Sequence, residues 1–148
     1  MKKTTIFTPL LVILLSALTA CTQNEGYIGD LFGLWRLEEI SDGTTVEECD
    51  TIFMAFQADV FQVRRVNYIS YDYTLFTGLY TRTDNLMQCN FLNHNGTDAV
   101  TDEQQQQMLQ DLASLHITEI SPVFVVEELN KRNMRLSYNG YRYIFVKL

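Results

Sequence analysis

The chain has 148 residues, of which 18 are acidic and 11 are basic, and its formal net charge is −7. This length suits one domain built around a single core. Nucleic-acid binding is disfavoured, because a protein that grips the phosphate backbone must neutralise it with Lys and Arg, and this acidic sequence contains no basic run.

The first 20 residues have the order of an export signal. Lys2 and Lys3 form a positive start, and the apolar stretch over residues 6–18 is too short for a transmembrane helix, which needs about 20 apolar residues. The stretch ends in Leu18-Thr19-Ala20-Cys21, which resembles the lipobox of bacterial lipoproteins: an aliphatic residue, two small residues and the Cys that receives the lipid. We therefore expect residues 1–20 to be a signal peptide that is cleaved before Cys21.

Residues 21–30 are predicted to be the lipidated Cys21 and a flexible tether, because the segment is polar, contains two glycines and has no periodic pattern. Without Lys2 and Lys3, 9 basic and 18 acidic residues remain, so the lipid must hold the chain on the membrane without electrostatic help. Thr22 is not an acidic inner-membrane retention residue. By resemblance to Gram-negative lipoproteins, this implies a lipid anchor in the outer membrane of the cell envelope.

Short strands dominate the rest of the chain, and one domain is predicted over residues 31–148. Eight antiparallel strands in so small a domain leave exposed edges, which closure into a barrel removes. The sequence therefore predicts an all-β fold, an eight-stranded antiparallel up-and-down barrel; a two-sheet sandwich is the alternative. Asn139-Gly140, flanked by alternating apolar residues, marks its last hairpin. The expected strands are 34–40, 51–57, 60–68, 71–82, 86–92, 123–129, 133–138 and 141–148.

One inserted helix is predicted over residues 102–115. Thr101 and Gln104 have the spacing of a capping box. Met108, Leu112 and Leu115 follow at i, i+4 and i+7 and form one apolar stripe. Since this stripe must cover something apolar, we expect the helix to pack on the outside of the barrel or across one end as a lid.

Gly33-Leu34-Trp35 opens the first expected strand and resembles the Gly-x-Trp signature of the lipocalin family. With the lipobox and the strand count, the chain resembles the small lipocalin-like lipoproteins of bacteria over residues 31–148. The resemblance implies that Gly33 and Trp35 close one end of the barrel beneath a basic residue of the last strand. Lys147 is the expected partner, and Arg142 is the weaker candidate. The inserted helix is a departure, because lipocalins carry their helix after the last barrel strand.

The aromatic residues allow two interpretations. A barrel of eight strands is just wide enough to be filled by side chains or to hold one small ligand. The aromatic side chains therefore either fill a core or line a cavity for an apolar ligand. The candidates for lining such a cavity are Trp35, Phe53, Phe61, Tyr73, Tyr80 and Tyr143.

The sequence contains no motif of catalysis or metal binding. His94 and His116 lie 22 residues apart without clustered ligands, and neither a glycine-rich phosphate loop nor a Gly-x-Ser-x-Gly elbow occurs. We therefore expect no metal, no cofactor and no enzymatic activity. The leading hypothesis is a lipid-anchored envelope protein that binds a small apolar ligand in the barrel. The alternative is an interaction or accessory protein of an envelope complex, with a filled barrel; cavity size separates the two.

Two cysteines remain after Cys21. In an exported protein, Cys49 and Cys89 would be expected to pair. In an up-and-down barrel, however, their strands lie on opposite sides of the interior, and a disulfide needs Cα atoms within about 7 Å. We predict that the two thiols are not bridged.

Overall fold

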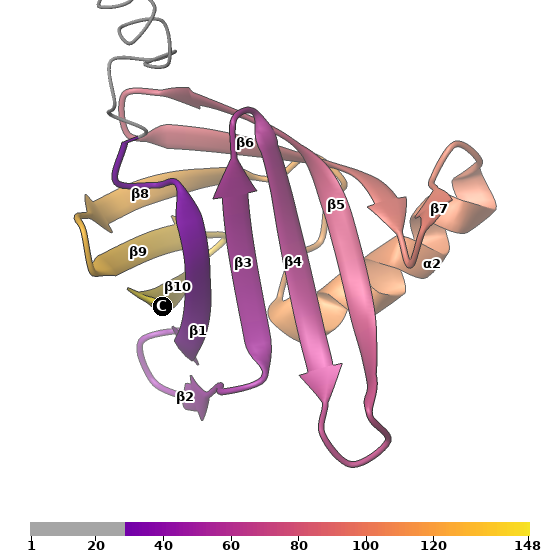
Figure 1. Ribbon diagram of the computed structural model, residues 1–148, viewed down its shortest axis with the longest axis horizontal. Helices are drawn as coiled ribbons and strands as arrows, with labels where there is room; N and C mark the ends of the chain where they lie inside the picture. The colour runs from indigo at the N-terminus through magenta and orange to yellow at the C-terminus, as the bar shows by residue number, and fades with distance from the viewer. Residues whose placement is uncertain (1–28) are drawn as a thin grey trace, which may run out of the picture.

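The computed structural model of the protein describes residues 29–148 (Figure 1). The expected signal peptide, Cys21 and the tether up to residue 28 lie outside the described residues. Within the described part of the chain, no helix is both long and apolar enough to cross a membrane. The elements are β1 (Gly33–Ser41), β2 (Val46–Glu48), β3 (Ile52–Gln57), β4 (Val60–Asn67), β5 (Asp72–Thr83), β6 (Leu86–His94), β7 (Thr97–Asp98), α2 (Asp102–Leu112), the 3₁₀ turn η1 (Ala113–Leu115), β8 (Val123–Leu129), β9 (Asn133–Tyr138) and β10 (Tyr141–Lys147).

Eight of these strands form a closed antiparallel barrel in the order β1-β3-β4-β5-β6-β8-β9-β10 (Figure 1). The barrel closes because β10 pairs with β1, with Trp35 opposite Lys147 and Ser41 opposite Arg142. This pairing confirms the predicted barrel and excludes the two-sheet sandwich. The helix lies between β6 and β8, yet these two strands still pair through Leu86 and Val125, so the insertion leaves the barrel order intact.

A single core fills the barrel, because alternate residues of each strand point inward. In β3, Ile52, Met54 and Phe56 are buried, and in β4 the same is true of Phe61 and Val63. Burying a large apolar side chain of this kind contributes roughly 1.5–3 kcal/mol. The alternation therefore fixes the register of the strands as well as their existence.

Two short strands were not predicted from the sequence. β1 pairs with β3 up to Arg36 and with β2 from Glu39 onward, and the β1–β10 ladder has a bulge between Leu37 and Glu39, at this change of partner. β7 pairs with the end of β6. Every residue of both strands lies on the surface, so neither strand carries the apolar alternation by which a strand is recognised.

The predicted helix is confirmed, with α2 and η1 together spanning residues 102–115. The capping box is present: the Thr101 side chain accepts a hydrogen bond from the Gln104 backbone N–H, and the Gln104 side chain accepts one from Thr101 N–H. All three residues of the apolar stripe, Met108, Leu112 and Leu115, are buried. The helical segment ends at His116, which adopts the left-handed conformation.

Cys49 and Cys89 are both free thiols, as predicted. Cys89 points into the core from β6, and burial raises the pKa of its thiol to about 12. Cys49 lies half-buried between β2 and β3, where desolvation and the charges of Glu47 and Asp50 raise its thiol pKa.

Candidate ligand-binding site

One end of the barrel is sealed by Trp35. Its side chain is fully buried, and its indole Nε1 donates a hydrogen bond to the backbone oxygen of Leu31 at 2.8 Å. The Lys147 Nζ lies 5.0 Å from the Trp35 ring centroid and donates to the backbone oxygen of Asp30 at 2.7 Å. Gly33 makes room for this lysine: it has a φ of +125°, and a Cβ there would lie 2.9 Å from Lys147 Cε. Asp30, which precedes the barrel, and Lys147, the last residue of β10, thus meet over the tryptophan.

Arg142, the weaker candidate for this position, lies at the other end of β10. Its Nε donates to the Glu127 carboxylate at 2.9 Å on the exposed surface. Because β10 is antiparallel to β1, only the last residues of β10 reach the start of β1. The lysine therefore lies over Trp35 and the arginine does not.

A lid closes the opposite end. We use this name for residues 113–118, the η1 turn and the three residues that follow it. The lid and the end of α2 contact β2, β4, β6 and β9, all at the strand ends farthest from Trp35. Side chains make these contacts in four pairs: Asp111 with His94 (2.8 Å), Ser114 with Arg65, His116 with Glu47 (2.8 Å) and Thr118 with Tyr138 (3.0 Å). The His116 ring also stacks on Tyr141 with the ring centroids 4.0 Å apart.

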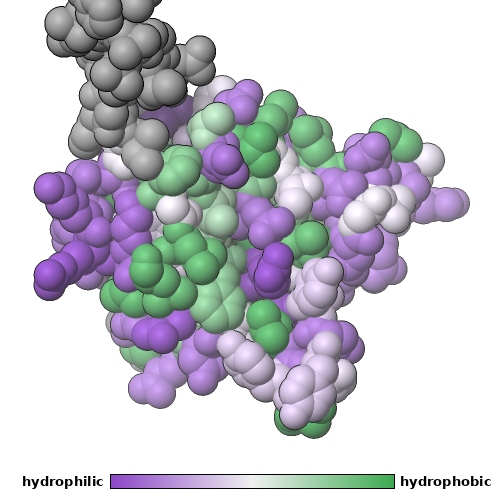
Figure 2. All heavy atoms as spheres, viewed as in Figure 1, coloured by the Kyte–Doolittle hydropathy of each residue, from purple (hydrophilic) through white to green (hydrophobic). Residues whose placement is uncertain are grey.

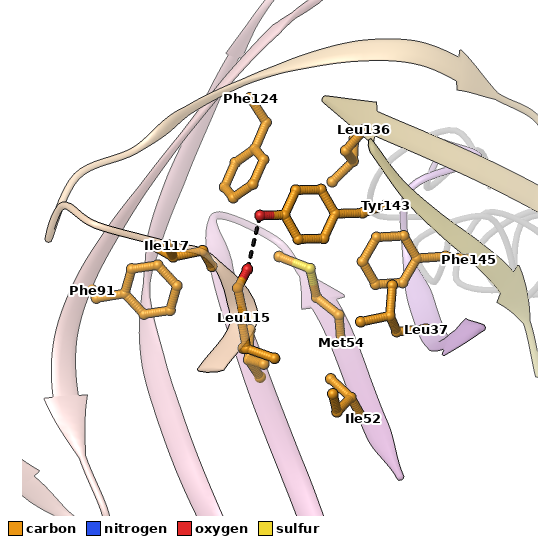
Figure 3. Close-up of a pocket in the computed structure, with 11 residues that line it drawn as sticks. Leu37, Ile52, Met54, Phe91, Leu115, Ile117, Phe124, Leu136, Tyr143 and Phe145 are labelled. Atoms are coloured by element: carbon orange, nitrogen blue, oxygen red, sulfur yellow. Dashed lines mark hydrogen bonds between the residues drawn. The ribbon is translucent and has the colours of Figure 1, made fainter. Parts of the chain in front are cut away.

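Between the two ends lies a small cavity of about 30 Å³ (Figure 3). A cavity needs about 10–15 Å³ to hold one water, and sites for small molecules measure about 300–1,000 Å³. In this conformation the barrel interior is therefore filled. Every lining side chain is apolar except the phenol of one tyrosine; the lining residues are Leu37, Ile52, Met54, Val63, Phe91, Leu115, Ile117, Phe124, Leu136, Tyr143 and Phe145.

The Tyr143 phenol is the polar exception. Its hydroxyl donates a buried hydrogen bond of 2.8 Å to the backbone oxygen of Leu115, and Figure 3 shows this bond reaching from β10 to the lid. Burial raises the pKa of the phenol above its ordinary range, and the nearby Tyr138, Tyr141 and Glu47 add to the shift. The surroundings of this hydroxyl therefore disfavour negative charge.

Four of the six predicted ligand-lining aromatics point into the barrel, but only Tyr143 lines the cavity. Trp35 belongs to the sealed end, and Phe61 is fully buried behind Phe91, with their ring centroids 4.9 Å apart. Tyr80 lies near the sealed end, where its hydroxyl donates to the Ala58 backbone oxygen at 2.7 Å.

The prediction that Phe53 and Tyr73 line the interior is wrong. Phe53 lies between the buried Ile52 and Met54 on β3. Because successive side chains of a strand point to opposite faces, Phe53 points outward. Tyr73 is exposed near the start of β5, with the Arg64 guanidinium 5.2 Å from its ring centroid. Both side chains belong to the outer wall.

Sequence reasoning missed most of the residues that line the cavity. Leu37 and Phe91 could have been found, because each occupies an inward position of a predicted strand, whereas the continuous apolar run of β3 leaves the direction of Met54 open. Leu115 had been assigned to the apolar stripe of the helix but not to the cavity. Ile117 carried no signal, because its direction depends on the left-handed turn at His116.

Residues 29–148 contain no group of three or more His, Cys, Asp or Glu side chains placed to hold a metal ion. Both histidines instead pair with carboxylates around the lid, as described above.

An antiparallel barrel of eight strands that runs up and down in sequence order is the architecture of lipocalin-like proteins. The sequence agrees: the model of the lipocalin-like domain family matches residues 15–148, and the chain belongs to that family.

Two solved structures from Bacteroides are similar to this chain. A lipocalin-like protein from Bacteroides uniformis ATCC 8492 is 26% identical, with a TM-score of 0.65, over 81% of this chain and 100% of that one. A protein from Bacteroides eggerthii DSM 20697, described only as uncharacterized, is 27% identical, with a TM-score of 0.63, over 80% of this chain and 99% of that one. No curated protein matches the sequence.

Proposed function

We propose that this lipocalin-like chain is a lipid-anchored protein of the cell envelope, without catalytic activity, that binds a small apolar ligand inside its barrel. The composition of the cavity wall carries the proposal. All eleven lining residues present apolar surface, and the one phenol among them is already hydrogen-bonded. Such a wall favours an apolar guest and supplies no nucleophile, acid–base pair or metal ligand.

A ligand can enter only if the lid moves, because the closed cavity of about 30 Å³ is too small for one. Leu115 and Ile117 are the two lining residues that do not belong to a barrel strand. If these two side chains moved out of the barrel, the cavity would extend into the volume that they now occupy. The polar pairs that hold the lid lie partly exposed at the rim, where such pairs contribute about 0–1 kcal/mol each. Local opening of the lid is therefore less costly than opening the barrel wall.

The direction in which the chain enters the barrel supports an anchored orientation. The described chain begins beside the sealed end, where Asp30 and Leu31 accept hydrogen bonds from Lys147 and Trp35. A lipid on Cys21 would thus hold the sealed end toward the membrane and leave the lid facing away. Cys21→Ser tests the anchor: the variant should leave the membrane fraction, and equally tight membrane association in both proteins would contradict it.

N-phenyl-1-naphthylamine, an uncharged fluorescent probe, tests the ligand site. We expect saturable binding of one probe per chain. Val63→Phe should abolish binding, because Val63 lines the cavity. Val60→Phe is the matched control: it makes the same substitution on the same strand, but at an exposed outward position. Absence of binding to the folded wild-type protein, or equal effects of the two variants, would contradict the proposal.

A second candidate function is an interaction protein with a permanently filled barrel. It is favoured by the tip of the β4–β5 hairpin, where Ile69 is 93% and Tyr71 is 90% exposed. The turn is pinned, since Asn67 Oδ1 accepts hydrogen bonds from the N–H groups of Ile69 and Ser70. Figure 2 shows further hydrophobic side chains on the outer face over β1 and β3. Exposed aromatic residues of this kind are enriched in protein interfaces.

The two functions make different predictions for Ile69→Ser. Under the interaction hypothesis, this variant should lose crosslinks to envelope proteins that the wild type forms, while the probe binds neither protein. Under the ligand hypothesis, it should bind the probe as the wild type does, because Ile69 lies outside the cavity wall.

A further inference from the structure

The hydrogen bond of Tyr143 joins two parts of the molecule that must separate when a ligand enters. The phenol belongs to β10 in the barrel wall, whereas the accepting oxygen belongs to Leu115 in the lid. Among the described residues, the phenol has no other hydrogen-bond partner. Opening the lid therefore removes the acceptor from a donor that lies inside an apolar chamber.

A buried donor without an acceptor is unfavourable, because it has lost its hydrogen bonds to water and gained none in return. The other wall side chains cannot replace Leu115, because none of them carries an accepting oxygen or nitrogen. A ligand that places an acceptor beside the phenol recovers this free energy, and a pure hydrocarbon does not. The open chamber thus selects for one polar atom at a defined place.

The charge of that polar atom also follows from the surroundings. The cavity wall contains no Lys or Arg, and Arg65, an arginine at the lid end, bonds Ser114 outside the wall. Glu47 lies close enough to Tyr143 to oppose negative charge there. A carboxylate would have to leave water without a buried cation to pair with, which is costly. An uncharged acceptor meets no such penalty.

We infer that the chamber binds an apolar molecule with one uncharged hydrogen-bond acceptor, such as a ketone, ester or ether oxygen, to which Tyr143 donates in place of its bond to Leu115. This inference rests on the proposed function, since it requires that the chamber be a ligand site. It makes Tyr143 the residue that determines specificity.

Three probes of similar size and one conservative substitution test the inference. Propiophenone carries a carbonyl group where propylbenzene carries a methylene group, and phenylacetate carries a carboxylate. Their dissociation constants follow from displacement of N-phenyl-1-naphthylamine. Tyr143→Phe should strengthen propylbenzene binding about fivefold, because the variant has no donor left without an acceptor, and should leave propiophenone binding nearly unchanged, because the wild type only exchanges one hydrogen bond for another. The wild type should bind phenylacetate more weakly than propiophenone.

Tyr138→Phe is the matched control, because Tyr138 is also a buried tyrosine at the lid end but lies outside the cavity wall. Tyr138→Phe should leave the ratio of the dissociation constants of propiophenone and propylbenzene unchanged. The inference is overturned if Tyr143→Phe also leaves that ratio unchanged while still binding the naphthylamine, or if the wild type prefers phenylacetate. Failure of the naphthylamine to bind the wild type would instead refute the ligand site itself.

Discussion

Lys147→Met should destabilise the protein by about 2 kcal/mol, although it changes a side chain that is only partly buried. A hydrogen bond that involves a charged group contributes about 1.5–3 kcal/mol, and a cation–π contact contributes about 0.5–1 kcal/mol. Lys147 makes both, to Asp30 and to Trp35. Because Lys147 is partly exposed, both contributions lie near the lower end of these ranges. Methionine keeps most of the apolar contacts of the lysine side chain, so little packing energy is lost.

Urea unfolding followed by circular dichroism measures this loss, with Lys131→Met as the control, since Lys131 is exposed and should cost less than about 0.5 kcal/mol. Combining Lys147→Met with Trp35→Phe gives a double-mutant cycle, in which we expect a coupling of about 0.5–1 kcal/mol. If the Lys147 and Lys131 variants unfold at the same urea concentration, the lysine does not help to seal the barrel.

Gly78→Ala should lower the unfolding free energy by more than about 3 kcal/mol, because its Cβ would lie 1.9 Å from the backbone oxygen of Asn90. Gly96 has open space around it, so Gly96→Ala should lower the unfolding free energy by only about 1 kcal/mol, through its positive φ. Thermal melts compare the two variants. Cys89, with a pKa raised to about 12 by burial, should resist alkylation at pH 8 until the protein unfolds, which mass spectrometry detects. The pKa of Asp42 is lowered to about 2, chiefly by the hydrogen bond that its carboxylate accepts from Thr45 N–H. The turn at Asp42 should therefore be stabilised above about pH 4 and lose that stabilisation as the pH falls toward 2. Carbon NMR of the carboxyl group should show a titration midpoint near 2.

The strands were predictable because apolar and polar residues alternate along most of them, which shows which face is buried. In β9, Met134, Leu136 and Tyr138 are buried, and the residues between them are polar, so both the element and its inward face follow from the sequence. The helix was predictable for a similar reason, since its cap and its stripe are both local patterns.

The orientation of β3 could not be predicted from the sequence. Ile52-Phe53-Met54-Ala55-Phe56 is apolar at every position, so the apolar run identifies a strand but not its inward face. Pairing with β1 and β4 decides the orientation and turns Phe53 outward. The size of the cavity was equally beyond the sequence, because it depends on how far Leu115 and Ile117 enter from the lid. These are packing facts that no local pattern contains.

The closure of the barrel has a consequence for how the chain folds. The hydrogen bond that joins Lys147 to Asp30 spans 117 residues of sequence, and the β1–β10 ladder has nearly the same separation. Contacts this distant slow folding, because the loop entropy must be lost before the contacts form. Until β10 arrives, one edge of β1 has no partner and is free to pair with other chains. Aggregation during refolding should therefore depend on protein concentration, and it should be strongest in variants that weaken the last strand.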